Sequence, residues 1–290
     1  MSSNITPDLL VEWLDQVLEI SIEAGREILE VYNDEASFSV ETKGDGSPLT
    51  LADRKAHEHI VGKLPAVGGE SHPTPILSEE SSGNEHEERL GWPRFWLVDP
   101  LDGTKEFVKR NGEFTVNIAL IDQGVPVLGV VHVPVKNESY IGVVDKGAWF
   151  VDSDGKRSAI RTNPFVKDNS GPPTVVASRS HAGGSTGDYV ANLTQDLGDP
   201  EVRSMGSSLK ICLVASGDAH IYPRLGPTCE WDTGAAHAVL AAAGGAILAP
   251  DGQDLAYNKA DVLNPWFFAT GGGHDWLQYL NGIEVPEKSA

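Results

Sequence analysis

The sequence predicts a layered α+β and α/β fold with two parts, and two observations carry that prediction. Residues 1–162 contain helical patterns followed by several strand patterns in a row, which is typical of helices packed on an antiparallel sheet. Residues 163–290 contain short strands that alternate with helices, which is typical of an α/β half. The stretch 163–173 is rich in Pro, Asn and Gly, so we expect a domain boundary there, between domains 1–162 and 163–290.

Two helices are predicted near the start of the chain. Thr6 supplies an N-cap and Pro7 the first helical position, and apolar residues then recur at helical spacing to about Tyr32. Those apolar residues are Leu9, Leu10, Trp13, Leu14, Val17, Leu18, Ile28 and Leu29. Thr50 and Asp53 form the pattern of a capping box, which predicts a second helix ending near residues 64–65.

Strand patterns follow these helices. Apolar runs at 75–78 and 95–98 predict short strands, and residues 114–120 alternate between apolar and polar side chains. Further strands of an antiparallel meander are predicted at 125–133, 140–144 and 148–151, and a hairpin turn at 152–155.

The second half alternates between strands and helices. Strands are predicted at 174–177, 201–203, 219–222, 246–248 and 267–270. Helices are predicted at 188–197, 207–216 and 230–243.

Composition limits the class of protein. The 290 residues include 42 Asp and Glu against 22 Lys and Arg, a formal net charge of −20, which disfavours binding to a nucleic-acid backbone. Two cysteines, Cys212 and Cys229, predict no disulfide framework. We find neither a signal-peptide pattern nor an apolar run long enough for an integral membrane segment, so we expect a cytoplasmic protein.

The run Asp99-Pro-Leu-Asp-Gly-Thr follows the predicted strand at 95–98 and carries the strongest chemical signal. Pro100 is expected to end that strand, so Asp99 and Asp102 leave its tip within one tight turn. Two carboxylates so close repel each other unless a cation lies between them, and Mg²⁺ prefers such oxygen ligands. The backbone N–H groups of Gly103 and Thr104 are placed to bind an anion such as phosphate. The alternative is an ordinary Asp-rich surface turn.

Three acids elsewhere are candidates to join this pair. Glu79 follows the predicted strand at 75–78, although a solvated acidic loop would look similar. Asp45 lies in a loop that Gly and Pro residues make rigid. Asp232 lies in the first turn of the helix at 230–243, where the helix dipole alone also favours an acid.

Cationic and polar side chains lie at strand ends and helix starts of the second half, where the ligand crevice of an open α/β sheet forms. They are His181, Ser207, Lys210 and Arg224.

The combination of these motifs resembles the lithium-sensitive inositol monophosphatase superfamily. The resemblance rests on Asp-Pro-Leu-Asp-Gly-Thr at 99–104, Ser-Glu-Glu at 78–80 and Trp-Asp at 231–232. Within the superfamily, residues 99–117 look like the branch of CysQ-type 3′(2′),5′-bisphosphate nucleotidases, which hydrolyse adenosine 3′,5′-bisphosphate (PAP) to AMP and phosphate. The resemblance spans almost the whole chain and implies the αβαβα sugar-phosphatase fold, a small-molecule nucleotide substrate and inhibition by Li⁺.

The resemblance also implies a set of Mg²⁺ ligands for two or three ions. Glu79, Asp99 and the backbone carbonyl of Leu101 would hold the first ion. Asp99, Asp102 and Asp232 would hold the second. Two such ions can activate a water and stabilise the leaving oxygen without a covalent intermediate.

Further roles carry over by position. Asp45 would bind a third Mg²⁺ or orient the attacking water, and Thr104 would hydrogen-bond that water. The nucleotide-binding positions would be His181, Ser207, Lys210 and Arg224.

Several alternatives stay open at this point. The chain could be an inositol monophosphatase or another sugar-phosphate phosphatase of the same fold, or a non-catalytic nucleotide- or metal-binding protein. A structural or interaction protein is the third class. The sulfated nucleotide PAPS as a second substrate, a monomer or a homodimer, and peripheral attachment to the inner membrane are also left open, although no basic amphipathic segment supports such attachment.

Overall fold

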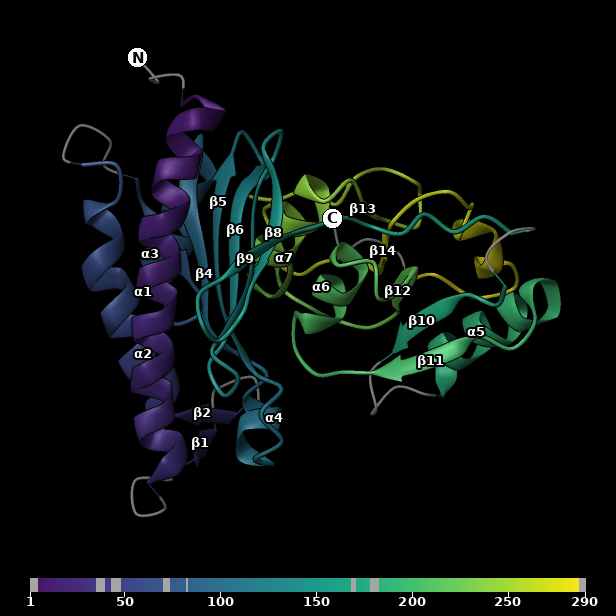
Figure 1. Cartoon of the computed structure of the whole chain (residues 1–290), viewed down its shortest axis with the longest axis horizontal. Coiled ribbons are helices and arrows are strands. Elements are labelled where there is room, and N and C mark those ends of the chain that lie inside the picture. The colour runs from purple at the N-terminus through teal and green to yellow at the C-terminus, as the bar shows by residue number, and fades with distance from the viewer. Residues whose placement is uncertain are drawn as a thin grey trace.

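The computed structural model describes residues 5–34, 40–42, 48–69, 74–81, 83–167, 171–177 and 183–286. These residues form alternating layers of helices and sheets (Figure 1). Helices α1 (Pro7–Asn33) and α2 (Leu51–Lys63) cover one face of a seven-stranded sheet. Helices α6 (Leu209–Ala215) and α7 (Glu230–Ala242) lie between that sheet and a five-stranded sheet. Helix α5 (Gly184–Leu197) packs on the outer face of the smaller sheet, which completes the predicted αβαβα arrangement.

The seven-stranded sheet has its strands in the order β3-β4-β5-β6-β7-β8-β9. Its strands are β3 (Ile76–Ser78), β4 (Arg94–Asp102), β5 (Thr115–Asp122), β6 (Val125–Val133), β7 (Glu138–Val143), β8 (Gly147–Val151) and β9 (Arg157–Ile160). The prediction of an antiparallel sheet is correct from β4 to β9, but β3 pairs parallel with β4. Strand β9 was not predicted, because its side chains are mostly exposed and show no apolar alternation.

The parallel pairing of β3 with β4 matters for the site. Ser78 lies opposite Val98, and the backbone N–H of Glu79 donates to the carbonyl of Val98 at 3.0 Å. Parallel strands end at the same edge of a sheet, so Glu79 and Asp99 emerge side by side.

Strand β4 does not end at Asp99, so the expectation that Pro100 terminates it is wrong. The strand continues to Asp102, with a register irregularity between Asp99 and Asp102. Proline has no N–H to give to a ladder and is tolerated where pairing is interrupted by a bulge. Gly103 then turns the chain with φ 93° and ψ 43°, a left-handed conformation that glycine adopts without strain. Helix α4 (Thr104–Val108) begins directly after it.

Both N-terminal helices begin where the sequence predicts. The Thr6 side chain accepts from the N–H of Leu9, with Pro7 as the first residue of α1. Thr50 and Asp53 form a capping box at the start of α2, which ends one residue before the predicted boundary. In both cases the capping side chain satisfies N–H groups that the helix itself leaves unpaired.

The smaller sheet has its strands in the order β11-β10-β12-β14-β13. Its strands are β10 (Thr174–Ala177), β11 (Glu201–Ser204), β12 (Ile221–Arg224), β13 (Ala246–Leu248) and β14 (Phe267–Thr270). Strand β10 runs parallel to β11 and β12, whereas β14 runs antiparallel to β12 and β13. The remaining described elements are β1 (Val40–Thr42), β2 (Pro48–Thr50), α3 (Gly83–Glu88) and the 3-10 turns η2 (Leu64–Ala66), η3 (Arg89–Gly91) and η5 (Leu277–Leu280).

Helix α7 joins the two halves. It belongs to the C-terminal half but packs across β4 to β8, opposite α1 and α2. One hydrophobic cluster holds Leu97 and Val131 from the first half together with Val176 and Val239 from the second. The division into domains 1–162 and 163–290 stays a prediction. None of the described helices is long and apolar enough to cross a membrane.

The backbone of α7 lies directly against the backbone of the large sheet. A Cβ atom built on Gly129 of β6 would lie 2.1 Å from the carbonyl oxygen of Ala235, and one on Gly142 of β7 would lie 2.9 Å from the Cα of Val239. Glycine therefore sets how closely the helix approaches the sheet, and with it the position of every residue on α7.

We predict that Gly129→Ala destabilises the fold by about 1–3 kcal/mol, because the added methyl group forces a backbone shift in α7. Thermal melting measures the effect. Gly62→Ala is the matched control: Gly62 is an exposed position of α2 with nothing near its would-be Cβ, so alanine should stabilise by about 0.5–1 kcal/mol. An unchanged or higher Tm for Gly129→Ala would contradict the backbone contact.

Candidate active site

Three carboxylates that lie far apart in the sequence meet at one place. Asp99 and Asp102 come from the end of β4, and Asp232 comes from the first turn of α7. Each of the three offers an oxygen, and these oxygens lie within 4.8 Å of one another. Asp99 is buried, and the other two are half-buried. The structure therefore brings together three of the acids that the sequence singles out.

The electrostatics of this cluster show how closely the acids interact. Burial raises the pKa of Asp99 well above its usual range, and the charges of Glu79, Asp102 and Asp232 raise it further. Burial and the charge of Asp102 raise the pKa of Asp232 to about 8, even though the Cys229 N–H donates to its carboxylate. Glu79 lies close enough to act on both aspartates, as predicted from the end of β3.

A cluster of this kind suits a hard divalent cation. Raised pKa values mean that the charges around these carboxylates do not compensate for their burial and mutual repulsion, and Mg²⁺ is bound in proteins by carboxylate and carbonyl oxygens. The carbonyl oxygen of Leu101 accepts from the Thr104 hydroxyl at 3.5 Å, and the Leu101 N–H donates to Asp99 at 3.0 Å, so this loop is held against the cluster. The residues present thus fit the metal that the sequence predicts.

Asp102 is held by three donors that the sequence analysis missed. Its Oδ2 accepts from the Ser208 N–H at 2.5 Å, from Asn117 Nδ2 at 3.2 Å and from the Thr115 hydroxyl at 3.5 Å. Ser208 also donates to Asn117 Oδ1 at 2.9 Å, so the start of α6 is tied to β5. The signal was present in the sequence, because Thr115 and Asn117 are the polar positions of an otherwise apolar strand.

Asp53 is another site residue that the sequence analysis missed. It is buried, and its Oδ2 accepts from the backbone N–H of Thr50 at 2.8 Å within the capping box. Its Oδ1 accepts from the Thr104 hydroxyl at 3.5 Å, and its charge contributes to raising the pKa of Asp99. Because the capping box alone explains an acid at position 53, the sequence does not indicate the contact between Asp53 and Thr104.

Two cations lie beside the acids. Burial lowers the pKa of Lys210 to about 8, although the charge of Asp102 opposes that shift. Its Nζ donates to the carbonyl of Ser207 at 2.6 Å and lies 5.6 Å from the centre of the Tyr222 ring. Arg224 Nη2 donates to the carbonyl of Pro227 at 2.8 Å, while its buried Nε has no hydrogen-bond partner among the described residues.

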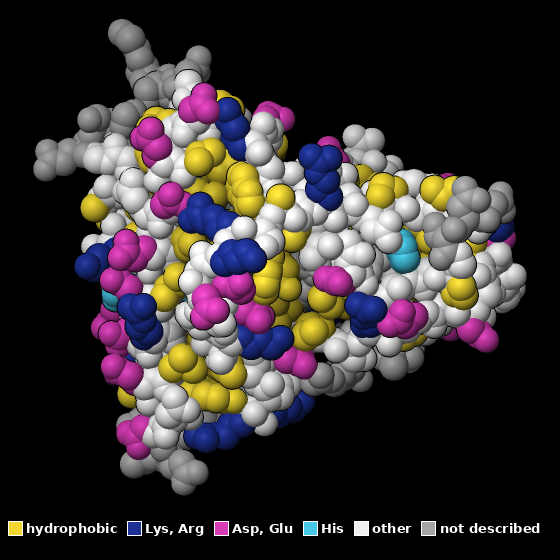
Figure 2. All heavy atoms as spheres, viewed as in Figure 1, with side chains coloured by type: hydrophobic (Ala, Val, Ile, Leu, Met, Phe, Trp, Pro, Cys, Tyr) yellow, Lys and Arg dark blue, Asp and Glu magenta, His cyan; other side chains and the backbone are white. Residues whose placement is uncertain are grey.

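The basic groups beside the cluster are local features of an acidic protein. On the face shown in Figure 2, Lys and Arg side chains lie scattered among Asp and Glu and do not form one continuous basic surface. The charges of Lys210 and Arg224 act on each other and on Asp232, which places both cations next to the acids. Asp45 and His181, which were also predicted to contribute, lie outside the described residues.

Comparison with known proteins gives a consistent picture. The sequence model described as "Inositol monophosphatase family" matches residues 12–273. The chain is 48% identical over 255 residues to the 3′(2′),5′-bisphosphate nucleotidase CysQ of Escherichia coli (strain K12), covering 88% of this chain and 98% of that protein. It is 35% identical over 268 residues to the protein of the same name from Haemophilus influenzae, covering 91% of this chain and 94% of that one.

Solved structures agree with this similarity. The crystal structure of CysQ from Bacteroides thetaiotaomicron superposes with a TM-score of 0.76 at 42% identity, covering 91% of this chain and 97% of that one. An inositol monophosphatase from Anabaena superposes with a TM-score of 0.67 at 23% identity, covering 97% of this chain and 98% of that one, and shows the shared fold alone.

Because the pKa values of Asp99 and Asp232 are raised, we predict that adding Mg²⁺ to the metal-free protein increases its Tm more at about pH 8 than at about pH 5.5. A carboxyl whose pKa is raised by folding, such as Asp232 at about 8, holds its proton more tightly in the folded state. The metal-free fold therefore loses stability as the pH rises from about 4 toward 8. Mg²⁺ displaces those protons, so its stabilising effect increases over the same interval.

Thermal melting of the metal-free protein with and without Mg²⁺ measures this difference. Burial lowers the pKa of His132 and of His237 to about 4, but their effect on stability is present in both melts and cancels. Asp232→Asn is the control, since it should raise the metal-free Tm at the higher pH and remove most of the Mg²⁺ effect. An equal increase in Tm on adding Mg²⁺ at both pH values would contradict the prediction that Mg²⁺ displaces protons from these carboxyl groups.

Proposed function

The chain belongs to the inositol monophosphatase family, and on this premise we propose that it is a Mg²⁺-dependent phosphatase that hydrolyses adenosine 3′,5′-bisphosphate to AMP and phosphate. The single observation that carries the proposal is the meeting of Asp99, Asp102 and Asp232 around one point, with Glu79 beside them. The curated relatives named as bisphosphate nucleotidases support the choice of substrate. PAPS stays open as a second substrate.

The proposed ligands of the metal are those that the sequence resemblance implies. Glu79, Asp99 and the carbonyl of Leu101 would hold one Mg²⁺, and Asp99, Asp102 and Asp232 a second. When bound, Mg²⁺ supplies positive charge to the phosphate and makes a water more acidic. Asp45 remains a proposed ligand or water-orienting acid. Water attacks the phosphorus directly, so no covalent intermediate between protein and phosphate is formed.

Thr104 and Asp53 are suited to orient the attacking water. The single proton of the Thr104 hydroxyl has two acceptors at 3.5 Å, Asp53 Oδ1 and the carbonyl of Leu101, and donation to either leaves a lone pair of Thr104 Oγ1 to accept from a water. The capping box fixes Asp53 at the start of α2, and Gly103 fixes the turn that carries Thr104. The N–H groups of Gly103 and Thr104 are proposed to bind the phosphate oxygens and stabilise the charge that develops there.

Lys210 and Arg224 are proposed to bind the second phosphate of the substrate. A bisphosphate brings more negative charge than the bound metals neutralise, so protein cations must supply the rest. Lys210 is buried beside Asp102, and Arg224 has a buried Nε without a partner among the described residues. Ser207 and His181 complete the proposed nucleotide site. A cytoplasmic location and the choice between monomer and homodimer stay predictions from the sequence.

The substrate is tested by comparing phosphate release from adenosine 3′,5′-bisphosphate and from inositol 1-phosphate, each with Mg²⁺. We expect a clear preference for the nucleotide, because a substrate with a single phosphate gives Lys210 and Arg224 no second phosphate to bind. Asp102→Asn is the control: it removes a charged ligand and should abolish both activities, which shows that the measured hydrolysis comes from this site. A preference for the inositol ester would favour the inositol monophosphatase alternative. Absence of both activities would favour the non-catalytic alternative.

We predict that Arg224→Ala raises the KM for adenosine 3′,5′-bisphosphate by about 10- to 100-fold, since it removes a charged partner of the second phosphate. The KM for a nucleoside monophosphate should change much less. Arg203→Ala is the matched control, because Arg203 pairs with Glu201 at an exposed position of β11. Equal effects of Arg224→Ala on both substrates would show that this residue does not bind the second phosphate.

A further inference from the structure

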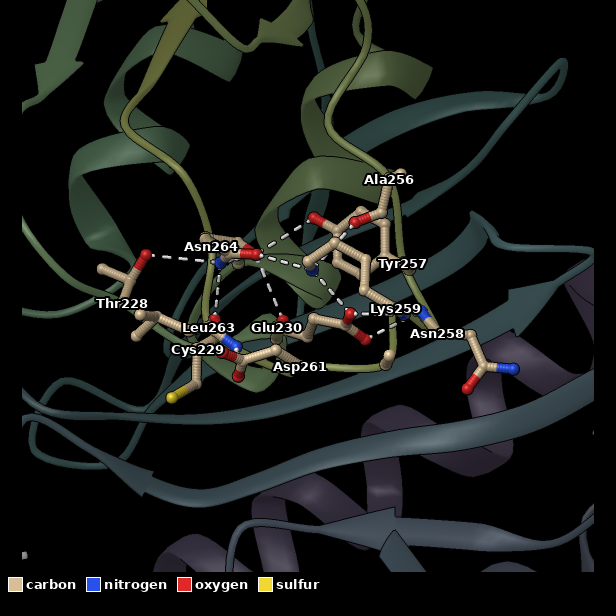
Figure 3. Close-up of polar contacts among 12 residues, drawn as sticks. Thr228, Cys229, Glu230, Ala256, Tyr257, Asn258, Lys259, Asp261, Leu263 and Asn264 are labelled. Carbon is tan, nitrogen blue, oxygen red and sulfur yellow. Dashed lines mark hydrogen bonds and ion pairs between the residues drawn. The ribbon is translucent and has the colours of Figure 1, made fainter. Parts of the chain in front are cut away.

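A second acid in the first turn of α7 points away from the metal cluster. Glu230 is fully buried, and its Oε2 accepts from the Asn258 N–H at 2.8 Å. Its Oε1 accepts from the Lys259 N–H at 2.9 Å and from Lys259 Nζ at 2.6 Å (Figure 3). Residues two apart on a helix lie on nearly opposite sides, so Glu230 faces the loop 256–264 while Asp232 faces the acids of β4.

Asn264 joins that loop to the backbone of the same turn. Lys259 Nζ donates to Asn264 Oδ1 at 3.2 Å, and Asn264 Nδ2 donates to the carbonyl of Cys229 at 2.8 Å (Figure 3). The N–H of Cys229 in turn donates to Asp232 Oδ2 at 2.7 Å. Hydrogen bonds therefore link the Glu230 carboxylate through Lys259 and Asn264 to the backbone of Cys229, and the N–H of that same residue holds the carboxylate of Asp232.

Two further contacts hold the same face of α7. Asn264 Nδ2 lies 3.2 Å from the Thr233 hydroxyl, and the Tyr257 hydroxyl donates to Thr233 at 3.1 Å. The backbone N–H of Glu230 donates to the carbonyl of Val262 at 2.9 Å. The first turn of α7 is thus fixed from the side opposite the metal cluster.

We propose that Glu230, Lys259 and Asn264 are positioning residues for Asp232, so that they set the Mg²⁺ affinity of the site without contacting the metal or the substrate. This inference rests on the proposed function, because it assumes that Asp232 is a Mg²⁺ ligand. One oxygen of Asp232 is held by Cys229, which fixes the orientation of the carboxylate beside Asp99 and Asp102. Residues that orient a metal ligand in this way typically contribute 10- to 100-fold to affinity.

Stabilising the fold is a poor explanation for this arrangement. A buried ion pair contributes little net stability compared with apolar side chains of the same size, because both charges lose their hydration. The Glu230–Lys259 pair has side chains that are 0% and 25% exposed. What the pair does supply is a fixed geometry, since two backbone N–H groups and one ammonium converge on a single carboxylate.

The test is calorimetric titration of the metal-free, full-length protein with Mg²⁺, well below its Tm. Glu230→Gln should weaken Mg²⁺ binding by about 10- to 100-fold, whereas Lys259→Arg keeps the ion pair and should stay within about threefold of wild type. At saturating Mg²⁺ the KM for adenosine 3′,5′-bisphosphate should stay near the wild-type value, because Lys210 and Arg224 are untouched. A merely structural role would lower the Tm and leave the Mg²⁺ affinity unchanged.

Arg94→Met is the matched control for loss of a buried ion pair. Arg94 Nη2 lies 3.1 Å from Asp122 Oδ2, with side chains 14% and 28% exposed. Arg94 starts β4 and Asp102 ends it, eight residues later (102 − 94), which is roughly 26 Å along the strand. We expect this variant to lower the Tm and to leave the Mg²⁺ affinity within about twofold of wild type.

Asn264→Ala keeps the inference testable if Glu230→Gln fails to fold. It removes the bond to the Cys229 carbonyl without leaving a buried charge, and should weaken Mg²⁺ binding by about tenfold. Wild-type Mg²⁺ affinity in a folded Glu230→Gln or Asn264→Ala protein would overturn the inference while leaving the proposed function intact. Failure of the wild-type protein to bind Mg²⁺ would overturn the proposed function and this inference together.

Discussion

Repulsion between buried carboxylates is the constraint on which the rest of this structure depends. Burial and the charges of neighbouring carboxylates raise the pKa values of Asp99 and Asp232, so a fold that gathers these acids must hold them in place against their own charge. It does so with rigid elements: a bulged strand end, a parallel neighbour that delivers Glu79, and a helix pressed onto the sheet at glycine positions. Each element is ordinary, and the site arises where they meet.

The elements of the fold could be predicted largely from the sequence, because each is specified by local chemistry. Thr6 and Pro7 begin α1, the Thr50 capping box begins α2, and the predicted ranges 125–133, 246–248 and 267–270 coincide with β6, β13 and β14. Pairing could not be predicted in the same way. The parallel partner of β4 and the bulge at Pro100 depend on contacts with strands that are distant in sequence.

The residues of the candidate site likewise include some that could be predicted from the sequence and some that could not. Glu79, Asp99, Asp102 and Asp232 could be found because each acid follows a strand predicted from the sequence or starts a predicted helix, where a free carboxylate is conspicuous. Asp53 could not, because the capping box already explained an acid at that position. Ser208 was missed in favour of Ser207, since only the fold shows that the N–H of Ser208 is the group that meets Asp102. The acids of the proposed metal site were therefore more predictable than the groups that orient them.

The backbone contact between α7 and the large sheet has a consequence for the order in which the chain matures. Asp232 is made 130 residues after Asp102 (232 − 102), so the whole seven-stranded sheet leaves the ribosome before the helix that covers its second face exists. Until then the nascent chain exposes an apolar surface to the cell and lacks the last carboxylate of its cluster. A divalent cation at the proposed site is accordingly unsuited to nucleate this fold, because Asp232 is made only after the large sheet.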